Sequence, residues 1–194
     1  MPRKPIPTWY VAAVVVRHHD RFLLIQEPKR GSPWSLPAGR AERGESLVDA
    51  AIRETLEESG VRARLTGLVR IEHTAERRHA RIRAVFVGEP EGDTTTKAVA
   101  DEESLAARWV TLAELGNYQL RNPAVEQLLR YVAAGAPVYP LAILQERDAP
   151  YQVAGEAPNE SARLTDGARR RDSGIVRAAR WLRSAIIADD LDPE

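Results

Sequence analysis

The spacing of apolar residues divides the first three quarters of the chain into strands and helices. Short runs rich in Val, Leu, Ile and Phe predict strands, since these side chains pack well on a pleated surface. The first run has consecutive valines, which is typical of a strand buried on both faces. The second follows it closely and predicts a β-hairpin. The strands expected are residues 9–17, 22–26, 64–73, 80–88 and 107–110.

Two further segments have apolar residues three and four positions apart and predict helices. The first helix begins after Ser46 as N-cap, with Asp49 in the capping-box position, and ends at Ser59 before Gly60. The second covers residues 123–134. Strands interrupted by two helices predict an α/β fold with a sheet covered on both sides. The apolar residues expected to hold the first helix on that sheet are Leu47, Val48, Ile52 and Leu56.

The two ends of the chain differ in composition from this central region. Residues 1–8 are rich in proline and are expected to be an N-terminal tether. Residues 146–194 contain many Pro, Gly, Asn and Arg residues, and are expected to be a partly disordered extension. An apolar stripe over 175–191 is compatible with a short helix. The domain expected in between covers residues 9–145.

Three acidic residues of the first helix carry the strongest functional signal. Glu54, Glu57 and Glu58 stand at positions i, i+3 and i+4, so their side chains converge on one face. Convergent carboxylates repel one another and destabilise a helix unless a cation lies between them. Hard divalent cations with oxygen ligands would offset this repulsion, and an all-oxygen ligand set suits Mg²⁺ or Mn²⁺ better than zinc.

The spacing around these acids resembles the Nudix box, G-x5-E-x7-R-E-U-x-E-E-x-G-U, where U is aliphatic. Every fixed letter is present. The departure is Thr55, which stands where the pattern has an aliphatic residue and bears on helix packing more than on metal binding. The matching residues are Gly39, Glu45, Arg53, Glu54, Glu57, Glu58, Gly60 and Val61.

This resemblance implies a Nudix α/β/α sandwich with a mixed β-sheet and a role for each matching residue. Glu54, Glu57 and Glu58, with the Gly39 carbonyl, would bind Mg²⁺ or Mn²⁺, and a water would attack phosphorus. Glu45 would pair with Arg53 to hold the loop against the helix, and Gly60 would end it. The general base stays open between a box glutamate and Glu103 in a later loop.

Segments outside the box are similar to Nudix enzymes that hydrolyse oxidised guanine nucleoside diphosphates. They imply a role in nucleotide pool sanitation, with any nucleotide diphosphate derivative as a close alternative. An ADP-ribose pyrophosphatase is disfavoured, because Glu76 stands where those enzymes have a proline. The residues expected to contact substrate are Trp34, Leu36, Arg40 and Glu102.

Composition limits the partners. The 28 basic and 28 acidic residues give zero net charge, which argues against a nucleic-acid coat or a surface for acidic lipids. The longest apolar run, residues 10–16, is too short to cross a bilayer. Cysteine is absent, which is compatible with the cytoplasm. The expected partners are a small-molecule nucleotide and, for a homodimer, a second copy of the chain.

Two functions from different classes follow from these patterns. The first is a metal-dependent hydrolase of nucleoside diphosphates. The second is a nucleotide-sensing Nudix module without turnover that uses residues 146–194 to contact a partner. The complete charge cluster favours the enzyme, because a module that only binds nucleotide has no need of Arg53, Glu54, Glu57 and Glu58 together.

Overall fold

The computed structural model of the protein describes residues 5–145 and residue 149. By its internal contacts the chain divides into Met1–Gln145 and Glu146–Glu194. The expectations for residues 146–194, including the helix over 175–191, lie outside the described residues. In Met1–Gln145 the strands are β1 (Thr8–His18), β2 (Arg21–Gln26), β3 (Trp34–Ser35), β4 (Ala38–Arg40), β5 (Ala63–Ala75), β6 (Ala80–Pro90) and β7 (Ala106–Thr111).

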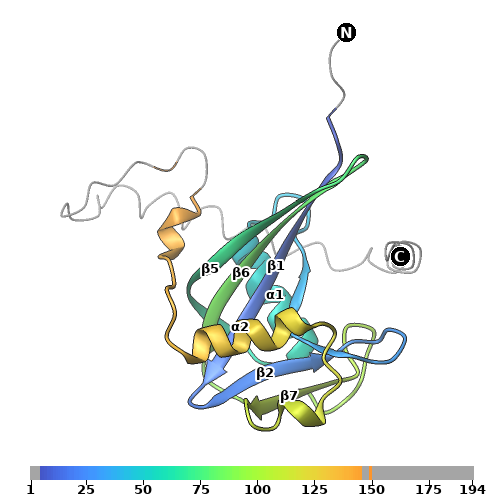
Figure 1. The fold of residues 1–194 in the computed structure, drawn as a ribbon, viewed down its shortest axis with the longest axis vertical. Helices are drawn as coiled ribbons and strands as arrows, with labels where there is room; N and C mark the ends of the chain where they lie inside the picture. Colours follow the sequence, from blue (N-terminus) through green and yellow to red (C-terminus); the bar gives the residue numbers. More distant parts are fainter. Residues whose placement is uncertain (1–4, 146–148, 150–194) are drawn as a thin grey trace, which may run out of the picture. The chain divides into compact units, whose positions relative to one another are not determined.

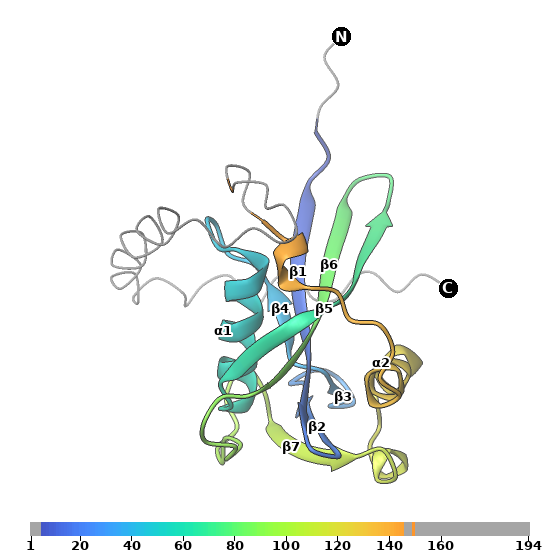
Figure 2. The same cartoon turned by 90° about the vertical axis from the view of Figure 1, so that its left-hand side faces the viewer.

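Two α-helices and two short 3-10 helices complete this unit. The helices are α1 (Leu47–Ser59), η1 (Leu115–Asn117), α2 (Pro123–Ala133) and η2 (Leu141–Ile143). Figure 2 shows α1 and α2 on opposite sides of the sheet. The predicted three-layer arrangement is therefore confirmed. None of the helices in the described residues is long and apolar enough to cross a membrane.

The sheet is mixed, as predicted. The strand order is β3-β2-β1-β6-β5, with β4 added to β1 and β7 to β2 (Figure 1). β1 and β6 run parallel over nine residue pairs, while β5 and β6 form a long antiparallel pair with two register shifts. β4 and β7 also pair antiparallel with their neighbours.

The predicted hairpin of β1 and β2 forms only at its turn. Only two residue pairs join these strands, Arg17 with Phe22 and His18 with Arg21. Beyond them β2 pairs along its whole length with β7, and residues 11–13 of β1 pair with β4. The two short strands β3 and β4 were not predicted, because two or three residues carry too little periodicity to read. β1 also begins at Thr8, a residue assigned above to the tether.

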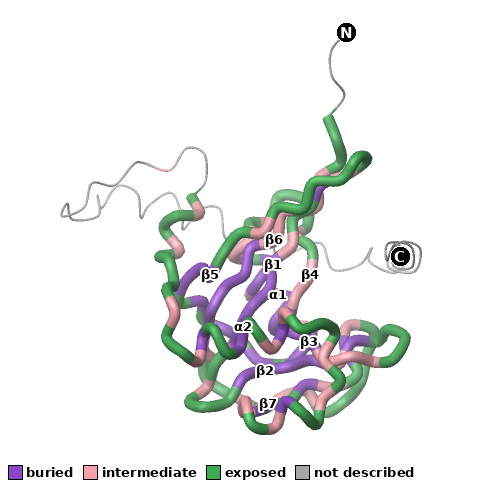
Figure 3. Tube along the Cα trace, viewed as in Figure 1, coloured by how far each residue is buried: buried purple, intermediate pink, exposed green. Residues whose placement is uncertain are grey.

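Apolar side chains on the two faces of the sheet form two core clusters. Alternate residues of a strand point to opposite faces, so Ala12, Val14 and Val16 of β1 lie on the α1 side and Val15 on the α2 side. All of these are buried, as a strand covered on both faces requires (Figure 3). The α2 side is completed by four predicted residues of that helix, Val125, Leu128, Leu129 and Val132.

Helix α1 is capped as predicted, and three of the four apolar residues expected to hold it on the sheet, Leu47, Val48 and Ile52, pack against the core. Ser46 accepts a hydrogen bond from the Asp49 amide, and Gly60 ends the helix at φ 78°. Leu56, expected to hold the helix on the sheet, is 43 % exposed. The most buried face of the helix carries small, hydroxyl and carboxylate side chains. The residues buried there are Ala50, Ala51, Glu54, Thr55, Glu58 and Ser59.

Thr55, the departure from the box pattern, is accommodated without an unpaired hydroxyl. Its side chain is fully buried on the inner face of α1. The hydroxyl donates to the carbonyl of Ala51 at 2.7 Å, one helical turn earlier. A buried threonine whose hydroxyl is hydrogen-bonded costs little relative to an aliphatic residue. The substitution therefore leaves the packing of the helix intact.

Candidate active site

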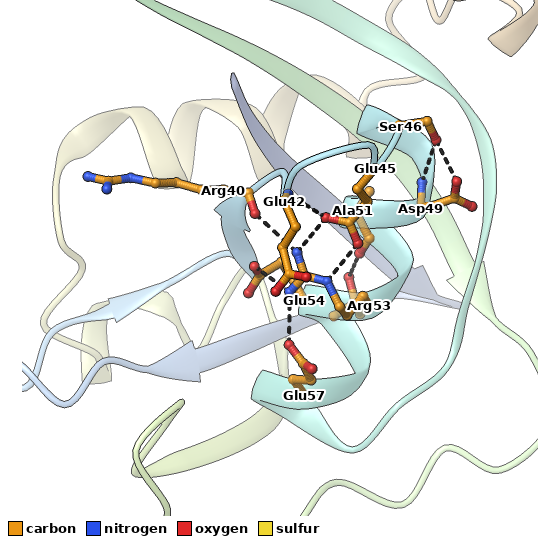
Figure 4. A network of polar contacts seen from close by, with 10 residues as sticks. Arg40, Glu42, Glu45, Ser46, Asp49, Ala51, Arg53, Glu54 and Glu57 are labelled. Carbon is orange, nitrogen blue, oxygen red and sulfur yellow. Dashed lines mark hydrogen bonds and ion pairs between the residues drawn. The ribbon is translucent and has the colours of Figure 1, made fainter. Parts of the chain in front are cut away.

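Arg53, in the middle of α1, is the centre of a polar network that also includes the loop before the helix (Figure 4). Its guanidinium donates to both carboxylate oxygens of Glu45, at 2.7 and 2.8 Å. It also donates to Glu54 at 2.7 Å, to Glu57 at 2.9 Å and to the Arg40 carbonyl at 3.0 Å. These hydrogen bonds, above all the one with Glu45, raise the pKa of Arg53 despite partial burial. One fixed positive charge thus joins the loop after β4 to two of the helix acids.

Gly39 is required by the close approach of Glu54. A Cβ atom at position 39 would lie 2.0 Å from the Glu54 side-chain carbon and 2.2 and 2.3 Å from its oxygens. No side chain fits in that space without displacing the carboxylate. The backbone of β4 at Gly39 therefore lies directly against the Glu54 carboxylate, and the two residues belong to the same site.

Glu58 is a buried carboxylate in an unfavourable environment. It is 9 % exposed and accepts a hydrogen bond from the Ala38 amide at 2.8 Å. Burial and the nearby charges of Glu54, Glu27 and Glu103 outweigh that hydrogen bond and raise the pKa of Glu58 to about 9. The ionised form would be stabilised by a cation placed beside it.

Glu54 is in a similar position. It is 8 % exposed, and burial raises its pKa although Arg53 acts against the shift. The charges of Glu57 and Glu103 raise it further. Glu103 lies in the loop between β6 and β7 and is half-buried. The fold therefore brings an acid that is 45 or more residues away in sequence close to two acids of α1.

These residues fit a hard divalent cation by donor type and by charge. The site holds several buried or half-buried carboxylates and one arginine, so its negative charge exceeds what Arg53 offsets. Among the residues that the structure describes, no group of three His, Asp or Glu side chains has its donor atoms already gathered around one point. Arg53 instead engages Glu54 and Glu57 directly.

The residues predicted to contact substrate are divided by the fold. Leu36 is 1 % exposed in the core on the α2 side, and Trp34 packs against the same core, edge-on to Tyr118. Neither side chain is presented to the carboxylates. Arg40 is exposed, with its guanidinium 4.7 Å from the ring centre of Trp9. Glu102 is exposed in the loop that carries Glu103.

One buried acid near the site was missed in the sequence. Glu27 follows β2 and is 6 % exposed, and its charge contributes to the raised pKa of Glu58. Arg121 donates to one of its oxygens at 3.0 Å. Lys29 lies 2.9 Å from the other, outside hydrogen-bonding geometry. The only sequence signal was a charged residue directly after an apolar strand, which is also common in exposed loops.

The Glu45–Arg53 pair gives a stability prediction. Glu45→Gln is expected to lower the free energy of unfolding by about 3 kcal/mol, because it leaves a partly buried guanidinium short of its main partner. Arg53→Gln should cost at least as much, since Glu54 and Glu57 then face each other without a cation. The double variant should be less unstable than the sum of the singles, with a coupling of about 1–3 kcal/mol in urea unfolding. Strict additivity would show that the pair contributes nothing jointly.

Comparison with known proteins places this site in a family. The model of the Nudix domain matches residues 7–132. The human 8-oxo-dGDP phosphatase NUDT18 is 44 % identical over 105 residues, which cover 52 % of this chain and 31 % of that protein. The phosphatase NudJ of Escherichia coli K12 is 32 % identical over 142 residues, covering 72 % of this chain and 92 % of NudJ. The chain thus spans about a third of the length of the 8-oxo-dGDP phosphatase it matches.

A solved structure agrees in fold as well as in sequence. A NUDIX hydrolase from Nitrosomonas europaea superposes with a TM-score of 0.61 at 31 % identity, covering 74 % of this chain and 99 % of that one. The family match spans α1, the Gly39 loop and the acids gathered around Arg53. The chain therefore belongs to the Nudix family.

Proposed function

We propose that this chain is a divalent-cation-dependent hydrolase of nucleoside diphosphates, with an oxidised guanine base as the first choice of substrate. The observation that carries the proposal is the pair of buried acids on α1, Glu54 and Glu58: burial raises the pKa of both, Glu54 lies against the backbone of Gly39, and the charge of Glu103 acts on both. Buried acids placed near one another destabilise a fold. A function that needs them, such as binding a cation together with an anionic ligand, explains their presence.

We assign the residues the roles that the Nudix box implies. Glu54, Glu57 and Glu58, with the Gly39 carbonyl, would hold Mg²⁺ or Mn²⁺. A bound divalent cation would neutralise phosphate charge and favour ionisation of an attacking water. Arg53 would orient the helix acids, and Glu45 would fix Arg53. A proton acceptor for the attacking water is available either in the helix acids or in Glu103.

Arg40, predicted to contact substrate, lies with Arg83 on the face of the sheet opposite α1. Val11 of β1 pairs with Arg40 on one side and with Arg83 on the other, so both arginines point to the α2 side of the sheet. Arg40 covers Trp9, and Arg83 contacts Glu72 at 3.3 Å. Arg40 directly follows Gly39, whose Cβ direction faces Glu54, so the Arg40 side chain points to the opposite face of the sheet and away from the helix acids.

The choice of a diphosphate rests on likeness to relatives. NUDT18 is named an 8-oxo-dGDP phosphatase, and it is 44 % identical to this chain over 105 residues. The reaction proposed is attack of water at the outer phosphorus, giving the nucleoside monophosphate and inorganic phosphate. A cytoplasmic location and a homodimer stay predictions of the sequence.

A substrate panel tests the proposal. With Mg²⁺ present, kcat/KM for 8-oxo-dGDP is expected to exceed that for 8-oxo-dGTP by about tenfold, because the extra phosphate must fit past the cation and the loop of Glu102. Unmodified dGDP and ADP-ribose are measured in parallel, with phosphate and monophosphate quantified. Preference for ADP-ribose or triphosphates would contradict the substrate choice. Tight binding without turnover of any compound would favour the nucleotide sensor.

A further inference from the structure

The loop between β6 and β7 is hydrogen-bonded to the last turn of α1. It supplies the donors for every carbonyl there that has no partner from the backbone of the helix or of Gly60. The final four carbonyls of a helix have no partner within it. Here the Gly60 amide donates to Leu56 at 2.8 Å. The next three carbonyls, those of Glu57, Glu58 and Ser59, accept from Lys97 Nζ at 3.1 Å, from Ser104 Oγ at 2.6 Å and from the Lys97 amide at 2.8 Å.

This attachment is close and largely buried. Ser104 is fully buried, and the Lys97 side chain is mostly covered. A Cβ atom on Gly60 would lie 2.9 Å from the Lys97 amide nitrogen, so the helix end and the loop backbone are in contact. The positive Lys97 ammonium also faces the end of α1 where the helix dipole is negative. These contacts therefore fix the loop against the C-terminal end of α1.

Asp101 closes the loop around the same two residues. One of its oxygens accepts hydrogen bonds from Lys97 Nζ at 2.5 Å and from the amides of Glu103 and Ser104, both at 3.0 Å. Its own amide donates to the Ser104 carbonyl at 3.0 Å. On the far side, the Leu105 amide donates to Gln26 of β2 at 2.8 Å. Glu103 therefore lies between two residues that hydrogen bonds hold in place, Asp101 before it and Leu105 after it.

We propose that Lys97, Asp101 and Ser104 are positioning residues that hold Glu103 beside Glu54 and Glu58. We call these three residues the loop latch. The proposal rests on the proposed function, because it assigns Glu103 a part in cation binding or water activation. It extends that function by naming what sets the place of an acid that α1 itself does not carry. Ser104 directly follows Glu103 and donates to the Glu58 carbonyl at 2.6 Å, so Glu103 lies beside the last turn of α1.

The test compares latch variants in two backgrounds. Lys97→Met and Ser104→Ala are made in the wild-type chain and in Glu103→Gln. In the wild type each is expected to lower kcat by about 10- to 100-fold, since small displacements of a catalytic group cost this much, with KM for the nucleotide nearly unchanged. In the Glu103→Gln background neither should lower kcat further. Asp93→Asn, in an exposed turn of the same loop, is the control and should keep wild-type kcat.

Mn²⁺ affinity, followed by the paramagnetic resonance of free Mn²⁺, gives a readout that needs no turnover. Latch variants should weaken Mn²⁺ binding in the wild type and not in Glu103→Gln. If the wild type hydrolyses nothing but this pattern holds, the proposed function fails and the latch stands. Equal losses of kcat and Mn²⁺ affinity in both backgrounds, or no effect of Glu103→Gln itself, would overturn the latch. If Ser104→Ala does not fold, Lys97→Met decides alone.

Discussion

Glu58→Gln is expected to lower kcat by about 10²- to 10³-fold at saturating Mg²⁺ while the protein becomes no less stable. Glutamine keeps the shape of the side chain and can still accept from the Ala38 amide, but it removes one negative charge from the proposed cation site. Because burial raises the pKa of Glu58 to about 9, the protein without a cation already holds this side chain as the neutral acid, and a neutral amide costs little stability. The variant should therefore lose activity without losing stability.

Glu57→Gln should cause a comparable loss of kcat with a small loss of stability, since Glu57 is more exposed and accepts from Arg53. Steady-state kinetics over a range of Mg²⁺ and thermal melting measure the two effects. Glu126→Gln, which breaks an exposed ion pair with Arg130 on α2, is the matched control and should change neither. Wild-type turnover by Glu57→Gln or Glu58→Gln at saturating Mg²⁺ would remove the helix acids from the cation site.

Gly39→Ala is expected to reduce kcat by about 10²-fold with the fold retained. The added methyl group would collide with the carboxylate end of Glu54, and a flexible side chain can move away where backbone could not. The cost therefore falls on the position of the acid and on its cation, not on the sheet. Mg²⁺ titrations of kcat should show a higher half-saturating concentration.

A matched glycine and a second background make this result specific. Gly116→Ala should have wild-type kcat, because nothing lies within 4 Å of its Cβ position and its φ lies outside the left-handed region. In a Glu54→Ala background, Gly39→Ala should cause no further loss, since the group it displaces is gone. A full additional loss there would mean that Gly39 acts through its own backbone and not through Glu54.

Much of the fold could be predicted from local patterns in the sequence. The start and end of α1 followed from Ser46, Asp49 and Gly60, because caps depend on residues within one turn of the helix end. The inward residues of α2 followed from their spacing of three and four. The error at Leu56 arose because the spacing of apolar residues does not say where the buried face of the helix ends. Leu47, Val48 and Ile52 pack as predicted, but the buried face is centred on alanine, threonine and glutamate side chains, and Leu56 lies outside it.

The sequence by itself determined the acidic face of α1, the Gly39 loop before it and the order of the main strands, since each depends on neighbours in the chain. Only the tertiary structure decided which distant residues join that face. Glu27 and Glu103 reach it from other strands and loops, while Leu36 and Trp34 turn into the core on the α2 side. The loop latch has the same origin. Open carbonyls at the end of a helix can be satisfied by any donor that the fold brings near, and no spacing along the chain records which one arrives.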